Sequence, residues 1–122
     1  MTNYFYDSYA IIEYIRGNKK YQTYFETHKG ITTLYNIMEV YYCLLREQGE
    51  KKAKHIIEVL KQILIHPSFE DIEPAMNFRF KHKERKFSYA DCLGYYLAKK
   101  NKIRFLTGDK GFKHIPHVEF VN

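Results

Sequence analysis

The chain has 122 residues, of which 45% are hydrophobic and 28% charged, proportions typical of one folded domain and not of a disordered or fibrous chain. Lys and Arg exceed Asp and Glu by 20 to 14, and this basic balance favours a polyanionic partner such as nucleic acid. No leader-like segment opens the chain, and no apolar run approaches the roughly 18 residues of a membrane span. We therefore expect a cytoplasmic protein without a membrane partner.

The first half of the chain alternates short apolar strands with helices. Gly17 and Gly49 each follow a stretch of helical apolar spacing and are expected to end it. The pattern predicts a strand over residues 4–6, helices over 8–15 and 19–27, a strand over 30–33 and a helix over 34–48.

The second half continues this alternation. A long helix is predicted to reach the break at His66 and Pro67, Asp71 is expected to cap the next helix, and Ser88 the one after it. No strand is predicted between residues 66 and 71. The expected elements are helices over 50–65, 71–83 and 89–101, then strands over 103–106 and 118–121.

Alternating strands and helices predict a single α/β domain spanning residues 1–122, with a mostly parallel central sheet flanked by helices. In such sheets, ligands bind beyond the carboxyl ends of the strands. Asp7 directly follows the first strand, and Asp109 follows a later strand after Thr107 and Gly108. Both carboxylates are therefore expected at the same rim of the sheet.

Two further acids are expected to approach this rim from helices. Asp91 lies in the first turn of the helix before the Asp109 strand, and Glu39 lies about one and a half turns into the helix over 34–48. On a helical wheel Glu39 falls opposite an apolar stripe made of Leu34, Ile37, Met38, Tyr41, Leu44 and Leu45.

Each acid also has a purely structural interpretation. Asp7 and Asp91 near helix starts are favoured by capping and by the helix dipole, and Asp109 is a common turn residue. A solvated helix face is the structural alternative for Glu39, although its neighbours Tyr35, Asn36, Tyr42 and Cys43 make that face poor in charge. Single positions do not decide between these interpretations.

Convergence favours a metal site. Four clustered carboxylates repel one another and raise one another's pKa values unless a cation neutralises them. Oxygen ligands of this kind suit Mg²⁺ or Mn²⁺, which also hold phosphate oxygens and activate water. An acidic metal site on a basic protein is the charge distribution expected of a nuclease.

Four motifs in this order resemble the signatures of PIN domains, and most closely those of VapC-type toxin ribonucleases. They are YFYDS at residues 4–8, NIMEVYY at 36–42, SYADC at 88–92 and LTGDKGF at 106–112. The resemblance covers essentially the whole chain.

The resemblance implies a Mg²⁺- or Mn²⁺-dependent ribonuclease that cleaves RNA by a metal-activated water. It implies that Asp7, Glu39, Asp91 and Asp109 coordinate the metal and are the catalytic acids, with Asp109 the most peripheral. Thr107 would supply a hydroxyl beside the pocket, with Ser8 and Asn36 as polar support. It also implies a homodimer inhibited by a protein antitoxin whose C-terminal segment crosses the active-site groove.

Two alternatives stay open: a PIN-type RNA-processing nuclease without an antitoxin, and an inactive PIN-like RNA-binding scaffold. A phosphoacceptor signalling module is disfavoured because no Asp occurs between Asp7 and Asp71 to follow a middle strand.

Overall fold

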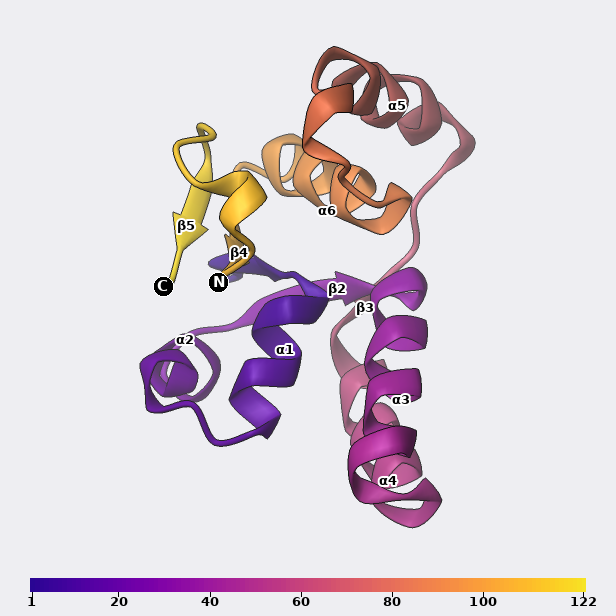
Figure 1. Ribbon diagram of the computed structural model, residues 1–122, viewed down its shortest axis with the longest axis vertical. Helices are drawn as coiled ribbons and strands as arrows, with labels where there is room; N and C mark the ends of the chain where they lie inside the picture. Colours follow the sequence, from indigo (N-terminus) through magenta and orange to yellow (C-terminus); the bar gives the residue numbers. More distant parts are fainter.

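The computed structural model describes residues 1–122 and contains a five-stranded sheet in which every pair of neighbouring strands is parallel (Figure 1). The strand order is β3-β2-β1-β4-β5. The strands are β1 Tyr4–Tyr6, β2 Gly30–Thr33, β3 Leu64–Ile65, β4 Arg104–Thr107 and β5 Val118–Phe120. The expected single α/β domain with a parallel central sheet is thereby confirmed.

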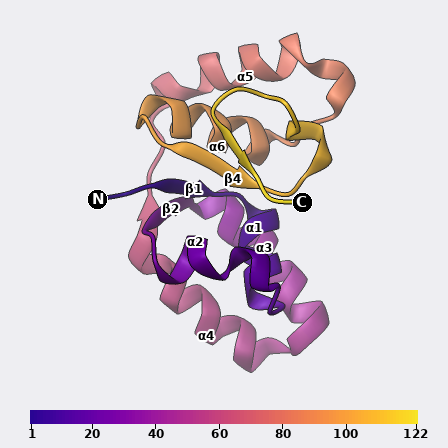
Figure 2. The same ribbon diagram turned by 90° about the vertical axis from the view of Figure 1, so that its left-hand side faces the viewer.

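Six α-helices cover the two faces of the sheet. Figures 1 and 2 show α1 to α4 on one side and α5 with α6 on the other. The helices are α1 Ser8–Ile15, α2 Gln22–Glu26, α3 Leu34–Gln48, α4 Glu50–Leu60, α5 Ile72–Lys81 and α6 Tyr89–Lys100. Five single 3₁₀ turns lie between the strands and helices: η1 Lys19–Tyr21, η2 Lys61–Ile63, η3 Phe69–Asp71, η4 Lys83–Arg85 and η5 Lys110–Phe112.

Alternation along the central strands divides the hydrophobic core in two. Because successive side chains of a strand point to opposite faces, Phe5 and Phe105 enter a core with α6, whereas Tyr6 and Leu106 enter one with α1, α3 and α4. All four side chains are buried. The two central strands are thus fixed in register by packing on both faces.

The end of the predicted helix over 50–65 is wrong. Helix α4 ends at Leu60, η2 follows, and Leu64 and Ile65 form the edge strand β3 beside Thr32 and Thr33. Pairing with β2 thus takes these apolar residues out of the helical pattern that they continue in the sequence.

Asp71 has the expected N-cap position of α5, but its side chain makes no capping hydrogen bond to that helix. Helical backbone already begins at η3, and Ser68 is its N-cap. The Asp71 carboxylate instead accepts hydrogen bonds from the Ser68 N–H (2.8 Å) and from Lys100 Nζ at the end of α6 (2.8 Å). It therefore ties η3 to α6.

The order of the strands creates a topological switch point beside the central strand β1. The chain proceeds outward from β1 through β2 to β3, and then returns to add β4 on the opposite side of β1. The connections after β1 and β4 consequently diverge at this switch point, which is where ligands bind in open α/β sheets. Asp7 follows β1 there, and Gly108 and Asp109 follow β4.

The two cysteines and the lengths of the helices are further features of the fold. Cys43 and Cys92 are buried and unpaired. No helix combines the length and apolar character required to cross a bilayer.

Gly94 accounts for how closely α6 lies against the sheet. A Cβ atom at this position would stand 2.6 Å from Phe5 Cε1 and 3.0 Å from Phe105 Cε1. The helix thus contacts the two central strands through a residue without a side chain. This contact explains a glycine in a helix interior, where it costs about 1 kcal/mol relative to alanine.

We predict that Gly94→Ala destabilises the protein although alanine is the better helix former. The added methyl group must displace two buried rings, at a cost of about 1–3 kcal/mol that exceeds the gain in helix propensity. Urea denaturation should show a lower free energy of unfolding, while Lys99→Ala on the exposed face of α6 should stay within about 0.5 kcal/mol of wild type. A Gly94→Ala variant as stable as wild type would contradict the close packing.

Candidate active site at the carboxyl ends of β1 and β4

Asp7 lies at the switch point of the sheet, directly after β1. It adopts an extended conformation, is the N-cap of α1, and is only 2% exposed. Its Oδ1 accepts a hydrogen bond from the Ser8 N–H (2.9 Å), and its Oδ2 accepts one from Thr107 Oγ1 (2.7 Å). The second bond crosses from β1 to β4, so the carboxylate is held by both central strands.

No basic side chain pairs with this buried acid. Burial raises the pKa of Asp7 well above its ordinary value, and the negative charges of Asp91 and Glu39 raise it further. The hydrogen bonds from Thr107 and Ser8 oppose this rise without cancelling it. A cation at this position would favour the ionised form.

Glu39 is connected to Asp7 through a short polar chain at the start of α1 and α3. Ser8 Oγ donates to Glu39 Oε1 (2.5 Å) and accepts from Asn36 Nδ2 (3.0 Å). Asn36 Oδ1 in turn accepts from Thr33 Oγ1 (2.6 Å), which caps α3. Asn36 and Thr33 are buried, and their polar side-chain atoms are hydrogen-bonded. This series of hydrogen bonds therefore fixes Glu39 relative to the end of β1.

The predicted apolar stripe of α3 is partly wrong. Leu34 and Met38 are 54% and 59% exposed, whereas Asn36, Val40 and Cys43 are buried. The buried face is rotated toward α1 and α4 because the hydrogen-bonded Asn36 belongs to it. Glu39 lies at the exposed edge of this face, within reach of Ser8.

Asp91 is held at the first turn of α6 by a reciprocal capping arrangement. The Ser88 N–H donates to Asp91 Oδ2 (2.9 Å), and the Asp91 N–H donates to Ser88 Oγ (3.0 Å). Burial raises the pKa of Asp91, as do the negative charges of Asp109 and Glu39, against the effect of the Ser88 hydrogen bonds. The acid is thus both a structural cap and a member of the acidic cluster.

Asp109 has a clear role in the turn after β4. Its N–H donates to Thr107 Oγ1 (3.1 Å), and its Oδ1 accepts from the Gly111 N–H (2.9 Å) as the N-cap of η5. Thr107 Oγ1 therefore accepts from Asp109 and donates to Asp7 at once. Gly108 is required here because a Cβ atom would lie 2.3 Å from Tyr21 Oη.

The structure therefore brings all four predicted acids, with Ser8, Asn36 and Thr107, to one rim. Sequence reasoning treated Ser88 only as a helix cap and did not single out Thr33. Both precede an interacting partner by three residues, Ser88 before Asp91 and Thr33 before Asn36. This capping spacing was the signal that could have identified them.

The donor set fits a hard divalent cation. All the clustered ligands are carboxylate or hydroxyl oxygens, and none of the four acids forms an ion pair. No three His, Cys, Asp or Glu side chains are close enough together to coordinate one ion directly. Mg²⁺ commonly binds through one or two carboxylates and keeps several waters, so an open arrangement of this kind is compatible with it.

Comparison with known proteins agrees with the fold. A sequence model of the PIN domain matches residues 4–118. Among similar solved structures, Mycobacterium tuberculosis VapC20 has 18% sequence identity and a TM-score of 0.79, with 98% of this chain and 100% of that chain covered. A toxin–antitoxin complex from Klebsiella pneumoniae has 20% identity and a TM-score of 0.75, with 97% of this chain and 96% of that chain covered. DNA-bound VapBC from Salmonella typhimurium has 12% identity and a TM-score of 0.78, with 99% of this chain and 98% of that chain covered. No curated protein matches the sequence. At these identities the structural likeness establishes the fold alone.

We predict that Asp7→Asn stabilises the metal-free protein at neutral pH. Since the folded-state pKa of Asp7 is raised, its ionised form opposes folding above that pKa, and this penalty disappears as the pH falls through it. The asparagine amide is neutral at every pH. Thermal melting in EDTA should show a gain of about 1 kcal/mol, or a Tm higher by roughly 4 °C, that shrinks on acidification.

Asp71→Asn provides a control of opposite sign. Burial disfavours the ionised Asp71, but hydrogen bonds from Lys100 and Ser68 outweigh it and hold the pKa below its usual value. Ionised Asp71 therefore stabilises the fold above its unfolded pKa, and this contribution is lost as the pH falls. Asp71→Asn should lower the Tm at neutral pH. Equal changes in Tm for the two substitutions would contradict the conclusion that ionised Asp7 destabilises the fold.

Proposed function

The chain belongs to the PIN domain family, and on that premise we propose that it is a Mg²⁺- or Mn²⁺-dependent ribonuclease that hydrolyses RNA phosphodiesters. The observation that supports this most strongly is the convergence of four acids on one rim without a basic partner. Such a cluster is costly to maintain unless it binds a cation. The formal net charge of the whole chain, +6 with these acids included, suits a polyanionic substrate.

We propose that Asp7, Glu39 and Asp91 surround the ion, with part of the set bound to it through water because no three of these side chains can ligate one ion directly, and that Asp109 contributes from the periphery. A bound divalent cation supplies Lewis acidity and positive charge beside the scissile phosphate. Thr107 keeps Asp7 Oδ2 in position, and Ser8 keeps Glu39 Oε1 in position. The second oxygen of Glu39 is not engaged by Ser8 and would be available to the ion.

No side chain at the rim is suited to act as a covalent nucleophile. Ser8 Oγ is engaged with Glu39 and Asn36, and no histidine bonds to it. Burial raises the pKa of the Cys92 thiol to about 12, so the reactive thiolate is scarce. Direct attack of water on phosphorus is therefore the mechanism that the residues favour.

We further propose that the protein is the toxin of a type II toxin–antitoxin pair, acting as a homodimer in the cytoplasm. Two of the similar folds carry the names of toxin–antitoxin assemblies, and VapC20 is described as a Sarcin-Ricin loop cleaving toxin. The match spans nearly the full length of both chains in each case. An RNA-processing nuclease without an antitoxin and an inactive RNA-binding scaffold remain the alternatives.

Cleavage of labelled RNA tests the activity. We expect cleavage with Mg²⁺ or Mn²⁺, none in EDTA, and a loss of roughly 100-fold or more for Asp7→Asn, Glu39→Gln and Asp91→Asn. Asp109→Ala should lose less, because its carboxylate already serves the η5 turn.

Asp71→Asn is the matched control for this assay, since it removes a buried carboxylate remote from the rim and should retain cleavage while folded. If wild type binds RNA but cleaves none with any divalent ion, the scaffold alternative is correct. If Asp109→Ala lowers stability and spares cleavage, Asp109 belongs to the turn alone.

Expression in a bacterial host tests the toxin proposal separately. We expect induction of wild type to arrest growth and induction of Asp7→Asn to have no effect, with equal protein levels verified by immunoblotting. The arrest follows if cleavage destroys an essential RNA. Cleavage in vitro without growth arrest would favour the processing nuclease.

A further inference from the structure

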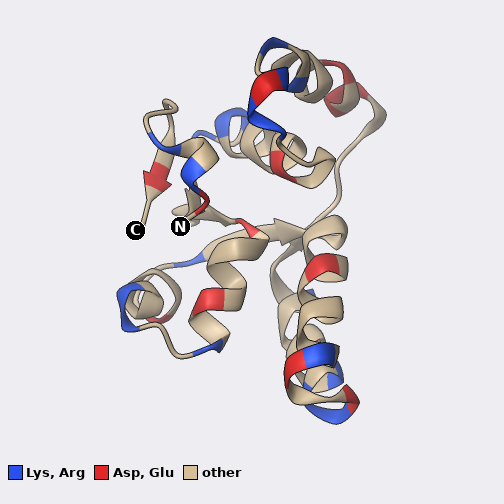
Figure 3. Cartoon of the chain, viewed as in Figure 1, with Lys and Arg blue, Asp and Glu red and all other residues tan.

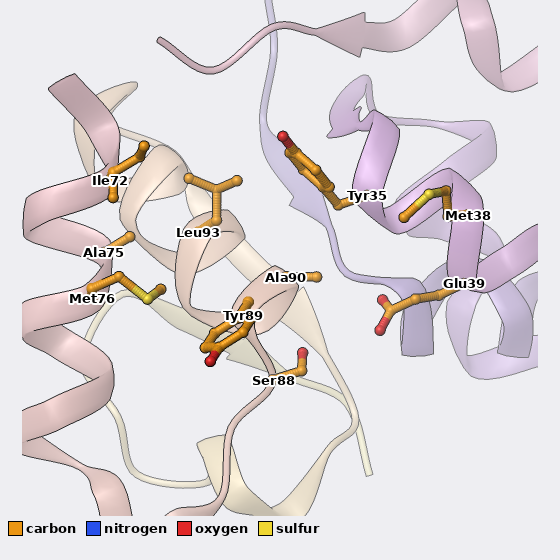
Figure 4. A pocket seen from close by; sticks show the side chains of 10 residues that line it. All are labelled: Tyr35, Met38, Glu39, Ile72, Ala75, Met76, Ser88, Tyr89, Ala90 and Leu93. Atoms are coloured by element: carbon orange, nitrogen blue, oxygen red, sulfur yellow. The ribbon is translucent and has the colours of Figure 1, made fainter. Parts of the chain in front are cut away.

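An apolar pocket of about 480 Å³ adjoins the acidic rim between α3 and the pair α5–α6 (Figure 4). Glu39 is its one charged lining residue, and Ser88 is the other polar group next to the acids. Figure 4 shows the Glu39 side chain extending from α3 toward Ala90 and Ser88 on α6. The pocket thus has one polar end at the candidate active site and an otherwise hydrophobic lining.

Large side chains on the pocket walls are exposed to solvent. Tyr89 on α6 is 69% exposed, and Tyr35 and Met38 on the α3 wall are exposed as well. The Tyr89 ring carries the Arg79 guanidinium carbon 4.7 Å from its centroid, and Arg79 Nε donates to the Phe87 carbonyl oxygen (2.9 Å). The Tyr89 ring therefore has Arg79 against one face and also lines the pocket.

Basic residues precede the Tyr89 wall in the chain. The segment just before Phe87 contains Lys81, Lys83, Arg85 and Lys86, and Arg85 Nη1 donates to the Gly111 carbonyl oxygen (2.8 Å), which joins η4 to η5. Lys110 and Lys113 lie on that second turn. Figure 3 shows blue Lys and Arg segments on the turns before α6 and after β4. Phosphates are attracted to this strip and repelled by the acidic end of the pocket.

We propose that the pocket binds one unpaired nucleobase of the RNA, next to the scissile phosphate, with the base stacked on Tyr89. This inference rests on the proposed ribonuclease activity and adds a base-recognition site to it. An aromatic wall binds any base by stacking, whereas the Ser88 hydroxyl meets the polar edge of the base. The basic strip accommodates the flanking phosphates.

Binding measured without cleavage tests this site independently of catalysis. Labelled single-stranded RNA is titrated in EDTA into the Asp7→Asn protein, and Kd is obtained by fluorescence anisotropy. Adding Tyr89→Ala should weaken binding roughly 5- to 100-fold, the range of one lost stacking interaction. Tyr89→Phe should stay within about twofold, because its ring still stacks.

Tyr42 provides a matched control on the same protein. It is 64% exposed and carries Arg46 at 5.0 Å from its ring, as Tyr89 carries Arg79, but it does not line the pocket. Tyr42→Ala should leave Kd unchanged. An equal loss for Tyr42→Ala and Tyr89→Ala would overturn the proposal in favour of nonspecific surface binding.

Oligonucleotides with one abasic position, scanned along the RNA, identify the bound base. One position should lower the affinity of the Asp7→Asn protein and have no effect once Tyr89→Ala is present. Unchanged RNA affinity of the Tyr89→Ala variant overturns the proposal. If that variant instead alters the mass in size-exclusion chromatography with light scattering, the pocket is an interface between copies of the chain. A protein with no nuclease activity but a Tyr89-dependent Kd would retain the site and refute only the catalytic function.

Discussion

The hydrogen bond from Thr107 to Asp7 is the contact on which the arrangement of the acidic rim depends. It joins the carboxyl ends of the two central strands, buries a carboxylate between them and, through the N–H of Asp109, sets the direction of the following turn. Two segments 100 residues apart in the chain are thereby locked at the switch point of the sheet. Because no cation of the protein balances Asp7, the same contact maintains a charge that opposes folding.

Much of this arrangement follows from simple rules applied to the sequence. Asp7 and Asp109 directly follow apolar strands, and parallel strands end at a common rim, so their proximity could be inferred without coordinates. Asp91 could be placed in a first helical turn because Ser88 is a good cap. The positions of these three acids depend on local sequence signals and on the order of strands and helices, and both can be inferred from the sequence alone.

Other features depended on contacts that no local pattern encodes. Leu64 and Ile65 continue the helical spacing of α4, and only their pairing with β2 makes them a strand. The exposed face of α3 was misjudged because buried Asn36 carries polar atoms that Thr33 and Ser8 satisfy. Hydrophobicity assigns such a residue to solvent, and only the partner residues reveal that it is internal.

Gly94 has a consequence beyond the stability of α6. The helix also carries Asp91, one turn before the point where its backbone rests on Phe5 and Phe105. The volume of residue 94 therefore affects how far Asp91 on α6 lies from Asp7 at the end of β1. Glycine, which has no side chain, allows the shortest distance. The size of a core residue thus affects the distance between the carboxylates of the acidic rim. A change in packing between α6 and the sheet changes the spacing of these negative charges.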